Sequence, residues 1–198
     1  MNEVRLANVN DINKIMRFIN DNWKENHILS RDRDFFIYEH QDNNTINYVI
    51  SLEDNKINGI LGFIKYSDNK SDIATVIWKA LKSVASPMLG IKLLEFLRNH
   101  KEYNIVFSPG INKETIGIYN YLGIYTGYLF QYIIINNNIE NFNILKIKKN
   151  NTLKKINFIE NNQYQLIELN KISFDFDFDK NQFIPHKDKN YFVKRYFN

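Results

Sequence analysis

Hydrophobic and polar residues follow regular periods along the first part of the chain. Val4 to Ala7 predicts a short strand, and the apolar residues from Ile12 to Ile19 recur at intervals of three and four, as in an amphipathic helix. Asp11 stands where a residue that caps this helix is expected. The next segment, Trp23 to His40, is rich in charged and aromatic residues and predicts another helix. The chain therefore begins with a strand and two helices.

Strand-forming sequences follow these helices. Ile46 to Leu52 and Ile57 to Tyr66 are rich in β-branched and aromatic residues, and the polar Glu53 to Lys56 between them predicts the turn of an antiparallel hairpin. Ile73 to Leu81 predicts a further strand. After a turn-forming stretch, Met88 to His100 carries leucines at helical spacing and predicts a helix.

A short helix with two polar residues follows the next strand. Asn104 to Phe107 predicts that strand, and Ser108 to Gly110 ends it. Asn112 and Tyr119 are seven residues apart, which is two helical turns, so a helix through both would place them on one face and in one groove. Gly123 lies just beyond the last apolar position, where a glycine commonly caps a helix.

The predicted order of elements is βααβββαβαβ, in which the last strand is Tyr128 to Ile135. This order predicts the α/β (α+β) class, with a mixed, mostly antiparallel central sheet flanked by helices. From Asn136 onwards the composition shifts towards Asn, Lys and isolated Ile. We therefore place a first domain at residues 1–136 and a C-terminal extension at residues 137–198.

The stretch Asn112-Lys-Glu-Thr-Ile-Gly-Ile-Tyr119-Asn-Tyr-Leu-Gly123-Ile124 resembles the asparagine-to-tyrosine helix and Leu-Gly-Phe exit of the GCN5-related N-acetyltransferase (GNAT) superfamily. With the order of elements, the resemblance covers roughly residues 3 to 135. It implies acetyl-coenzyme A (acetyl-CoA) or another acyl-CoA as the cofactor. It also implies that Asn112 lies near the pantetheine arm and that the Tyr119 hydroxyl protonates the departing thiolate. The alternative for Tyr119 is a packing residue of an amphipathic helix.

The resemblance implies further contacts with the cofactor. Gly90 and Ile91 align with the Gly-x-x-Leu-Leu end of the family's phosphate-binding loop, whose backbone N–H groups bind pyrophosphate at a helix N-terminus. Met88 and Ala85 stand where the family has its first glycine and its Gln or Arg. Further candidates for cofactor contact are Trp78, Lys79 and Ala80, through the strand backbone, and the side chain of Lys82.

The base that would deprotonate the acceptor amine has two main candidates, Asp72 and His27, and Glu39 and Asp32 are further ones. Asp72 precedes a predicted strand, where it could instead cap a turn, and His27 lies in the early helical segment that borders the acceptor pocket in the family. The segment His27 to Glu39 resembles acyltransferase-like proteins encoded among bacterial surface-polysaccharide genes, which implies an amino-sugar acceptor. The charged residues of this segment also suit surface ion pairs. Candidates for substrate binding are Arg31, Asp32, Glu39 and Ser108.

The composition narrows the class of protein. The 198 residues, 44% hydrophobic and 15% aromatic, are typical of a globular protein. Cysteine is absent, which excludes disulfides, thiolate metal sites and a cysteine nucleophile. No leader sequence opens the chain and no apolar run approaches the roughly 20 residues of a membrane span, so we expect a cytoplasmic protein. The sequence has no metal-ligand spacing, so we expect no metal. It also lacks the Gly-x-Ser-x-Gly elbow of hydrolases and the Walker loop of nucleotide triphosphatases.

The net charge of +4 and the pI of about 9.0 suit a small polyanion, a membrane surface or a nucleic acid as partner. The densest basic run, Lys146 to Lys155, alternates with Asn, Ile and Leu as on a solvated face. We therefore expect no nucleic-acid partner.

The C-terminal extension contains two further patterns. Phe174 to Asp179 alternates like an edge strand or a loop, and Lys189 to Phe197 predicts the start of a helix that has no partner left in the chain. We interpret the extension as the start of a second, truncated GNAT-like module. Its apolar face would need cover from the first domain or from another copy, so a homodimer is a further expectation.

Together these features predict an acyl-CoA-dependent N-acyltransferase. The expected acceptor is a small amine, such as a nucleotide-linked amino sugar of cell-surface polysaccharide synthesis. Two alternatives stay open. One is a FemAB-like transferase that moves an aminoacyl or acyl group to a glycan precursor. The other is a catalytically silent GNAT-like binding domain, which the missing glycine at Met88 favours.

Overall fold

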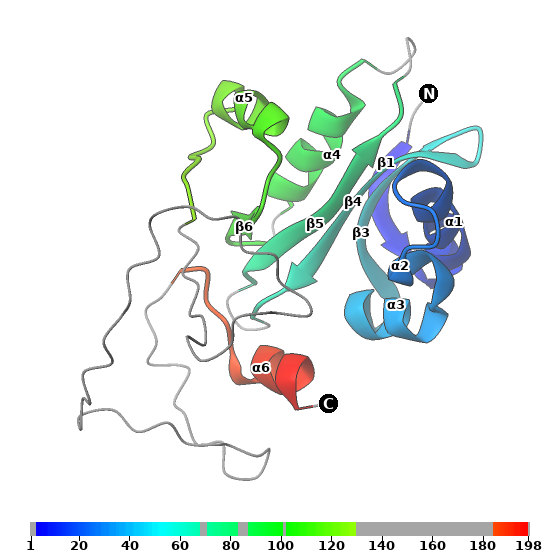
Figure 1. Ribbon diagram of the computed structural model, residues 1–198, viewed down its shortest axis with the longest axis horizontal. Coiled ribbons are helices and arrows are strands. Elements are labelled where there is room, and N and C mark those ends of the chain that lie inside the picture. Colours follow the sequence, from blue (N-terminus) through cyan, green and yellow to red (C-terminus); the bar gives the residue numbers. More distant parts are fainter. Residues whose placement is uncertain (1–2, 68–70, 83–86, 101, 130–183, 198) are drawn as a thin grey trace, which may run out of the picture.

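A computed structural model of the chain describes residues 3–67, 71–82, 87–100, 102–129 and 184–197 (Figure 1). The strands are β1 (Glu3–Asn8), β2 (Gln41–Asp42), β3 (Thr45–Glu53), β4 (Lys56–Lys65), β5 (Ile73–Ala80) and β6 (Val106–Phe107). They form a six-stranded sheet in the order β1-β3-β4-β5-β6, with β2 paired to β3 beside this path. All pairs are antiparallel except β5 with β6, which is parallel.

Helices cover both faces of the sheet (Figure 1). The helical elements are η1 (Val9–Asp11), α1 (Ile12–Asn22), α2 (Ile28–Arg31), α3 (Arg33–His40), α4 (Leu89–Arg98), α5 (Lys113–Tyr121) and α6 (Lys189–Tyr196). Apolar residues of α1, α2 and α3 pack with Tyr48 and Ile60 in a first core, and those of α4 and α5 pack with Leu61 and Phe63 in a second. This is the helix-flanked, mostly antiparallel fold that the sequence predicts.

The predicted hairpin is confirmed, whereas the predicted cap of α1 is wrong. β3 and β4 are joined by Asp54 and Asn55, whose φ angles of 48° and 61° are those of a tight two-residue turn. Asp11 precedes α1 but makes no capping hydrogen bond with it. Its buried carboxylate instead accepts hydrogen bonds from the Arg5 guanidinium at 2.7 Å and from the Asn8 N–H at 2.9 Å. A charged partner satisfies a buried carboxylate better than a helix end does.

Three other elements differ from the prediction. The segment from Trp23 to His40 contains two helices, α2 and α3, because Asp32 between them is extended and caps α3 through the Phe35 N–H at 2.9 Å. The two-residue β2 is too short for a periodic signal. Tyr128 and Leu129 are not in a strand, and the rest of the strand expected up to Ile135 lies outside the described residues.

A bulge in β5 decides which of its side chains face the second core. Leu61 pairs with Trp78 and Phe63 pairs with Thr75, so two residues of β5 stand opposite Gly62 alone. Thr75 and Trp78 are three residues apart and nevertheless lie on the same face. Gly62 has no room for a side chain, because a Cβ there would lie 2.7 Å from the ring of Tyr48.

The C-terminal helix docks beside the end of β4 and α3. α6 begins after Asp188, whose carboxylate accepts a hydrogen bond from the Tyr191 N–H at 2.9 Å. The Tyr191 ring meets that of Tyr66 with centroids 4.9 Å apart, and Arg195 pairs with Glu39 of α3 at 3.0 Å. A helix at this point is confirmed, whereas the expectation that it has no partner in the chain is wrong, since it covers the end of β4 beside α3.

Several expectations fall outside the described residues. They concern the domain boundary at residue 136, the basic run Lys146 to Lys155 and the alternating segment Phe174 to Asp179. Within the described ranges, every helix is too short or too polar to cross a membrane.

Candidate active site

Helix α5 holds Tyr119 against the second core. The helix ends at Tyr121, and Gly123 just beyond its C-cap has a φ of 69°, so the predicted glycine cap is confirmed. Tyr119 is 4% exposed, and its ring meets the Trp78 indole edge to face with centroids 5.9 Å apart. Asn112 precedes the helix as its exposed N-cap, whereas Tyr119 is buried. The Asn112 side chain accepts a hydrogen bond from the Glu114 N–H at 3.4 Å.

Three hydroxyl groups gather where β5 and β6 separate. The Thr75 hydroxyl donates a hydrogen bond to the Ser108 hydroxyl at 2.7 Å, and both interact with the Tyr119 hydroxyl. Burial raises the pKa of Tyr119, and the two neighbouring hydroxyls offset this shift only in part. Tyr119 is therefore protonated throughout the neutral range. We call this region, made of Thr75, Trp78, Ser108 and Tyr119, the β5/β6 fork.

The fork leaves one edge of β5 open. The pairing between β5 and β6 covers only Ile73 and Ala74 at the start of β5. From Thr75 to Ala80, no strand among the described residues pairs with β5 on this side. Trp78, Lys79 and Ala80, which the sequence suggested as backbone contacts of the cofactor, all lie on this edge. Such an edge offers N–H and C=O groups to an extended ligand.

Trp78 connects the fork to the start of α4. Its Nε1 donates a hydrogen bond to the Gly90 carbonyl at 3.1 Å, and a Cβ on Gly90 would lie 3.4 Å from that nitrogen. Met88, before the helix, has a left-handed φ of 62° and gives no side-chain cap, so no side chain of the described residues caps the first-turn N–H groups. Ile91 is half-buried in this turn, and Lys82 is exposed on the preceding loop.

Asp72 lies beside the start of β5 but not in the fork. It is 1% exposed, and its two carboxylate oxygens accept hydrogen bonds from the His186 backbone N–H at 2.7 Å and the Asn104 side chain at 3.3 Å. Thr75 is three residues further along an extended chain, roughly 10 Å away. This geometry suits an anchor for the C-terminal segment rather than a base at Tyr119.

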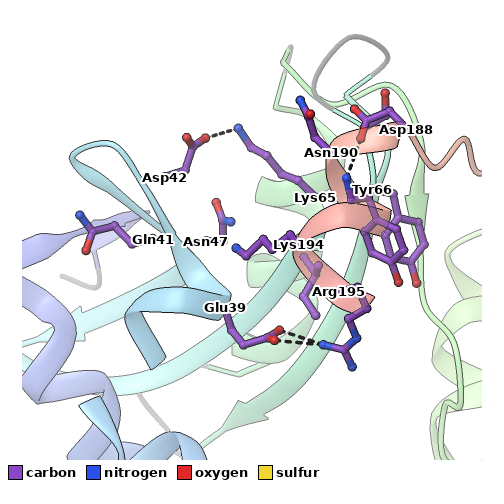
Figure 2. A pocket seen from close by; sticks show the side chains of 13 residues that line it. Glu39, Gln41, Asp42, Asn47, Lys65, Tyr66, Asp188, Asn190, Lys194 and Arg195 are labelled. Atoms are coloured by element: carbon purple, nitrogen blue, oxygen red, sulfur yellow. Dashed lines mark hydrogen bonds and ion pairs between the residues drawn. The ribbon is translucent and has the colours of Figure 1, made fainter. Parts of the chain in front are cut away.

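The other candidates lie on the face of the sheet that α1, α2 and α3 cover. His27 caps α2, since its Nδ1 accepts a backbone N–H of that helix at 3.2 Å, and Asp32 caps α3. Glu39 is held by Arg195 (Figure 2). Arg31 is exposed and forms no ion pair within the described part of the chain. The structure therefore brings Ser108, but none of these four, to Tyr119.

Sequence reasoning missed Thr75. Regular alternation along β5 would put Thr75 and Trp78 on opposite faces, and only the bulge brings them together. The available signal was Gly62, because a glycine inside a strand often marks a bulge or a close approach. The described residues contain no group of three His, Asp or Glu side chains placed to hold a metal.

Comparisons with known proteins define the fold. No protein-family model and no curated protein sequence matches this chain. An aminoglycoside acetyltransferase, HMB0005, from an uncultured soil metagenomic sample superposes with a TM-score of 0.52 and 13% identity, over 69% of this chain and 99% of that one. AAC(6')-Iy, solved with the bisubstrate analogue CoA-S-monomethyl-acetylneamine, superposes with a TM-score of 0.51 and 13% identity, over 69% of this chain and 99% of that one. The chain thus has the fold of the GNAT acetyltransferases, as the sequence resemblance predicted.

Proposed function

We propose that this protein is an acyl-CoA-dependent N-acyltransferase that transfers an acetyl group to a small amine. The observation that carries the proposal is the β5/β6 fork, where a buried and protonated Tyr119 stands beside the open edge of β5. The fold supports the same activity. One solved structure that shares it is named an aminoglycoside acetyltransferase, and another holds a bisubstrate analogue of CoA.

The described residues fit an acyl-CoA. The edge from Trp78 to Ala80 offers backbone groups to an extended pantetheine arm. The start of α4 at Gly90 offers N–H groups without a side-chain cap to the pyrophosphate, and the exposed Lys82 can add positive charge. When bound, the cofactor supplies an acyl group activated as a thioester.

Tyr119 is the proton donor in this proposal. Departure of a thiolate is easier when an acid delivers a proton to the sulfur. A phenol whose pKa is raised by burial keeps its proton at neutral pH and is therefore in the protonated form that a general acid needs. The Thr75 and Ser108 hydroxyls orient the phenol on one side, and the Trp78 indole holds its ring on another.

The amine must lose a proton before or during attack. Asp72 accepts two hydrogen bonds and His27 accepts one from backbone, so each is already used in a structural contact. We therefore propose that the proton leaves to water at the fork rather than to either side chain.

The acceptor in this proposal is an amino sugar, such as a nucleotide-linked sugar used in cell-surface polysaccharide synthesis. Support comes from the name of the aminoglycoside acetyltransferase that shares the fold, since aminoglycosides are built from amino sugars. We also propose that the protein is cytoplasmic and forms a homodimer.

A catalytically silent binding domain is the second candidate. Met88 replaces a glycine of the family motif, adopts a left-handed conformation and is 58% exposed beside the start of α4. A side chain at this point can obstruct the approach of a pyrophosphate.

Calorimetric titration of acetyl-CoA and desulfo-CoA into the full chain tests the proposal. We expect micromolar binding, roughly −8 kcal/mol, and acetylation of an amino-sugar acceptor such as glucosamine. Gly90→Leu should weaken binding because the new side chain would displace the Trp78 indole. Gly117→Ala is the matched control, since a Cβ there meets nothing within 4 Å.

Each contrary result has its own meaning. Binding without turnover on any amine would support the silent domain. Absence of CoA binding by folded protein would contradict the acyl-CoA-dependent enzyme and leave the aminoacyl-transfer alternative and a silent domain that binds another partner.

A further inference from the structure

A pocket lies between α6 and the sheet, where β4 leaves β3. The two strands pair only as far as Tyr48 and Gly62, and β2 pairs with β3 beyond that point. The pocket has a volume of about 190 Å³, below the roughly 300–1,000 Å³ of drug-sized sites, so it suits a ligand of monosaccharide size. We call it the α6 pocket; the residues that matter below are Glu39, Asp42, Asn47, Lys65, Lys194 and Arg195.

Two ion pairs form opposite sides of the α6 pocket (Figure 2). Lys65 of β4 pairs with Asp42 of β2, and Arg195 of α6 pairs with Glu39 of α3 at 3.0 Å. A third carboxylate, Asp188, caps α6 through the Tyr191 N–H. All three carboxylates of the wall are therefore already held by a cation or a helix end.

Lys194 is the cation of this wall that lacks a carboxylate. It forms no ion pair with any described residue, and its ammonium lies 5.1 Å from the centre of the Tyr38 ring. The positive charge of Lys194 also acts on the protein interior, where it helps burial to lower the pKa of His40. Figure 2 shows Lys194 in the middle of the pocket between the two ion pairs.

Asn47 provides an independent observation. It lines the pocket, is 6% exposed, and its amide makes no hydrogen bond with another described residue. The polar atoms of this amide are not among the buried atoms that lack a partner, so they reach the open space of the pocket and are available to hydrogen-bond a ligand there. Figure 2 shows the Asn47 amide between the Asp42–Lys65 pair and Lys194.

We propose that the α6 pocket binds a small polar molecule with one anionic group, a carboxylate or a phosphate. The anionic group lies between the Lys194 ammonium, which supplies the charge, and the Asn47 amide N–H, which supplies a hydrogen bond. The rings of Tyr66 and Tyr191 offer apolar surface to the rest of the molecule. Such a ligand joins β3 to α6. The site does not depend on acyl transfer at the β5/β6 fork.

Nuclear magnetic resonance titration of the ¹⁵N-labelled full chain tests this site, with glucuronate, inorganic phosphate, glucose and glucosamine as probes. We expect glucuronate or phosphate to shift the Asn47 side-chain amide resonances and to bind at least tenfold more tightly than glucose. Binding of glucuronate alone identifies a carboxylate ligand, and binding of phosphate alone identifies a phosphate ligand.

Two lysine variants of α6 make the test specific. Lys194→Gln should weaken anion binding at least tenfold, whereas Lys189→Gln, an exposed lysine of the same helix that does not line the pocket, should leave it unchanged. The proposal is overturned if no anionic probe shifts Asn47 at tens of millimolar, if glucosamine binds as tightly as glucuronate, or if Lys194→Gln binds anions normally. Acetyl-CoA binding by Lys194→Gln should match that of the unmodified chain, so a failure here is distinct from a failure of the proposed function.

Discussion

The sheet opens at two places, and the chemistry of the two openings is opposite. At the β5/β6 fork the side chains are neutral: two hydroxyls and an indole surround the buried phenol of Tyr119. At the α6 pocket the wall carries charges that are mostly paired with one another. Burial of a neutral hydroxyl raises its pKa and preserves a proton for chemistry, whereas burial of charges requires partners. The first opening therefore suits catalysis and the second suits recognition.

The sharpest test of the neutral opening is Tyr119→Phe. This change keeps the ring against Trp78 and removes only the hydroxyl. We expect turnover to fall about 100-fold, because general-acid groups typically contribute 10²–10⁴-fold, while acetyl-CoA affinity stays nearly unchanged. Steady-state kinetics with calorimetry checks this. Tyr121→Phe on the same helix, 79% exposed, should have no effect. Unchanged turnover in Tyr119→Phe would remove the tyrosine from the mechanism.

Asp72→Ala tests whether this carboxylate anchors the C-terminal segment or acts as the base at the β5/β6 fork. Its loss leaves the buried backbone N–H of His186 without an acceptor. We expect the free energy of unfolding to fall by about 2–3 kcal/mol, measured by urea denaturation, while the folded variant keeps its pH–rate profile. Glu25→Ala, at an exposed site, is the control. A changed pH–rate profile in stable protein would instead support Asp72 as the base.

The charged opening predicts sensitivity to acid through His40 beneath it. Burial lowers the pKa of His40 to about 4, from an ordinary value of 6.5. Between pH 6.5 and pH 4 the His40 side chain is therefore protonated in the unfolded chain but neutral in the folded protein. The contribution of His40 to the free energy of unfolding is complete above pH 6.5 and is lost as the pH falls towards 4. At pH 5 we expect a loss of about 2 kcal/mol. Urea denaturation at pH 7 and pH 5 measures it.

A variant isolates the contribution of His40. In His40→Met the loss of unfolding free energy between pH 7 and pH 5 should shrink by about 2 kcal/mol, since the titrating ring is gone. His27→Gln should retain the full loss. An unchanged pH dependence in His40→Met would assign the acid sensitivity to other groups.

The smallest effect is expected at the rim of the α6 pocket. Arg195 is 49% exposed and Glu39 is 11% exposed, so their ion pair is partly screened by solvent. Arg195→Gln should therefore cost less than about 1 kcal/mol of unfolding free energy. Thermal denaturation at low and high salt checks this, and a larger cost that persists in high salt would show that docking of α6 depends on this pair.

Much of the molecule follows from the sequence alone. The hairpin between β3 and β4, helices α1, α4 and α5, and the cap at Gly123 are local consequences of hydrophobic period and turn chemistry. Such features depend on residues close together in the chain, so a single sequence specifies them.

The tertiary structure decided the features that join distant residues. The bulge opposite Gly62 turned Thr75 towards Tyr119, and Arg5 drew Asp11 away from its predicted cap. Docking of α6 placed Lys194 in one pocket with Asn47, which is far from it in the sequence, and no local pattern indicates this pocket. The physical reason is that hydrophobic period fixes which face of an element is buried, whereas register, bulges and ion pairs are settled only when the elements meet.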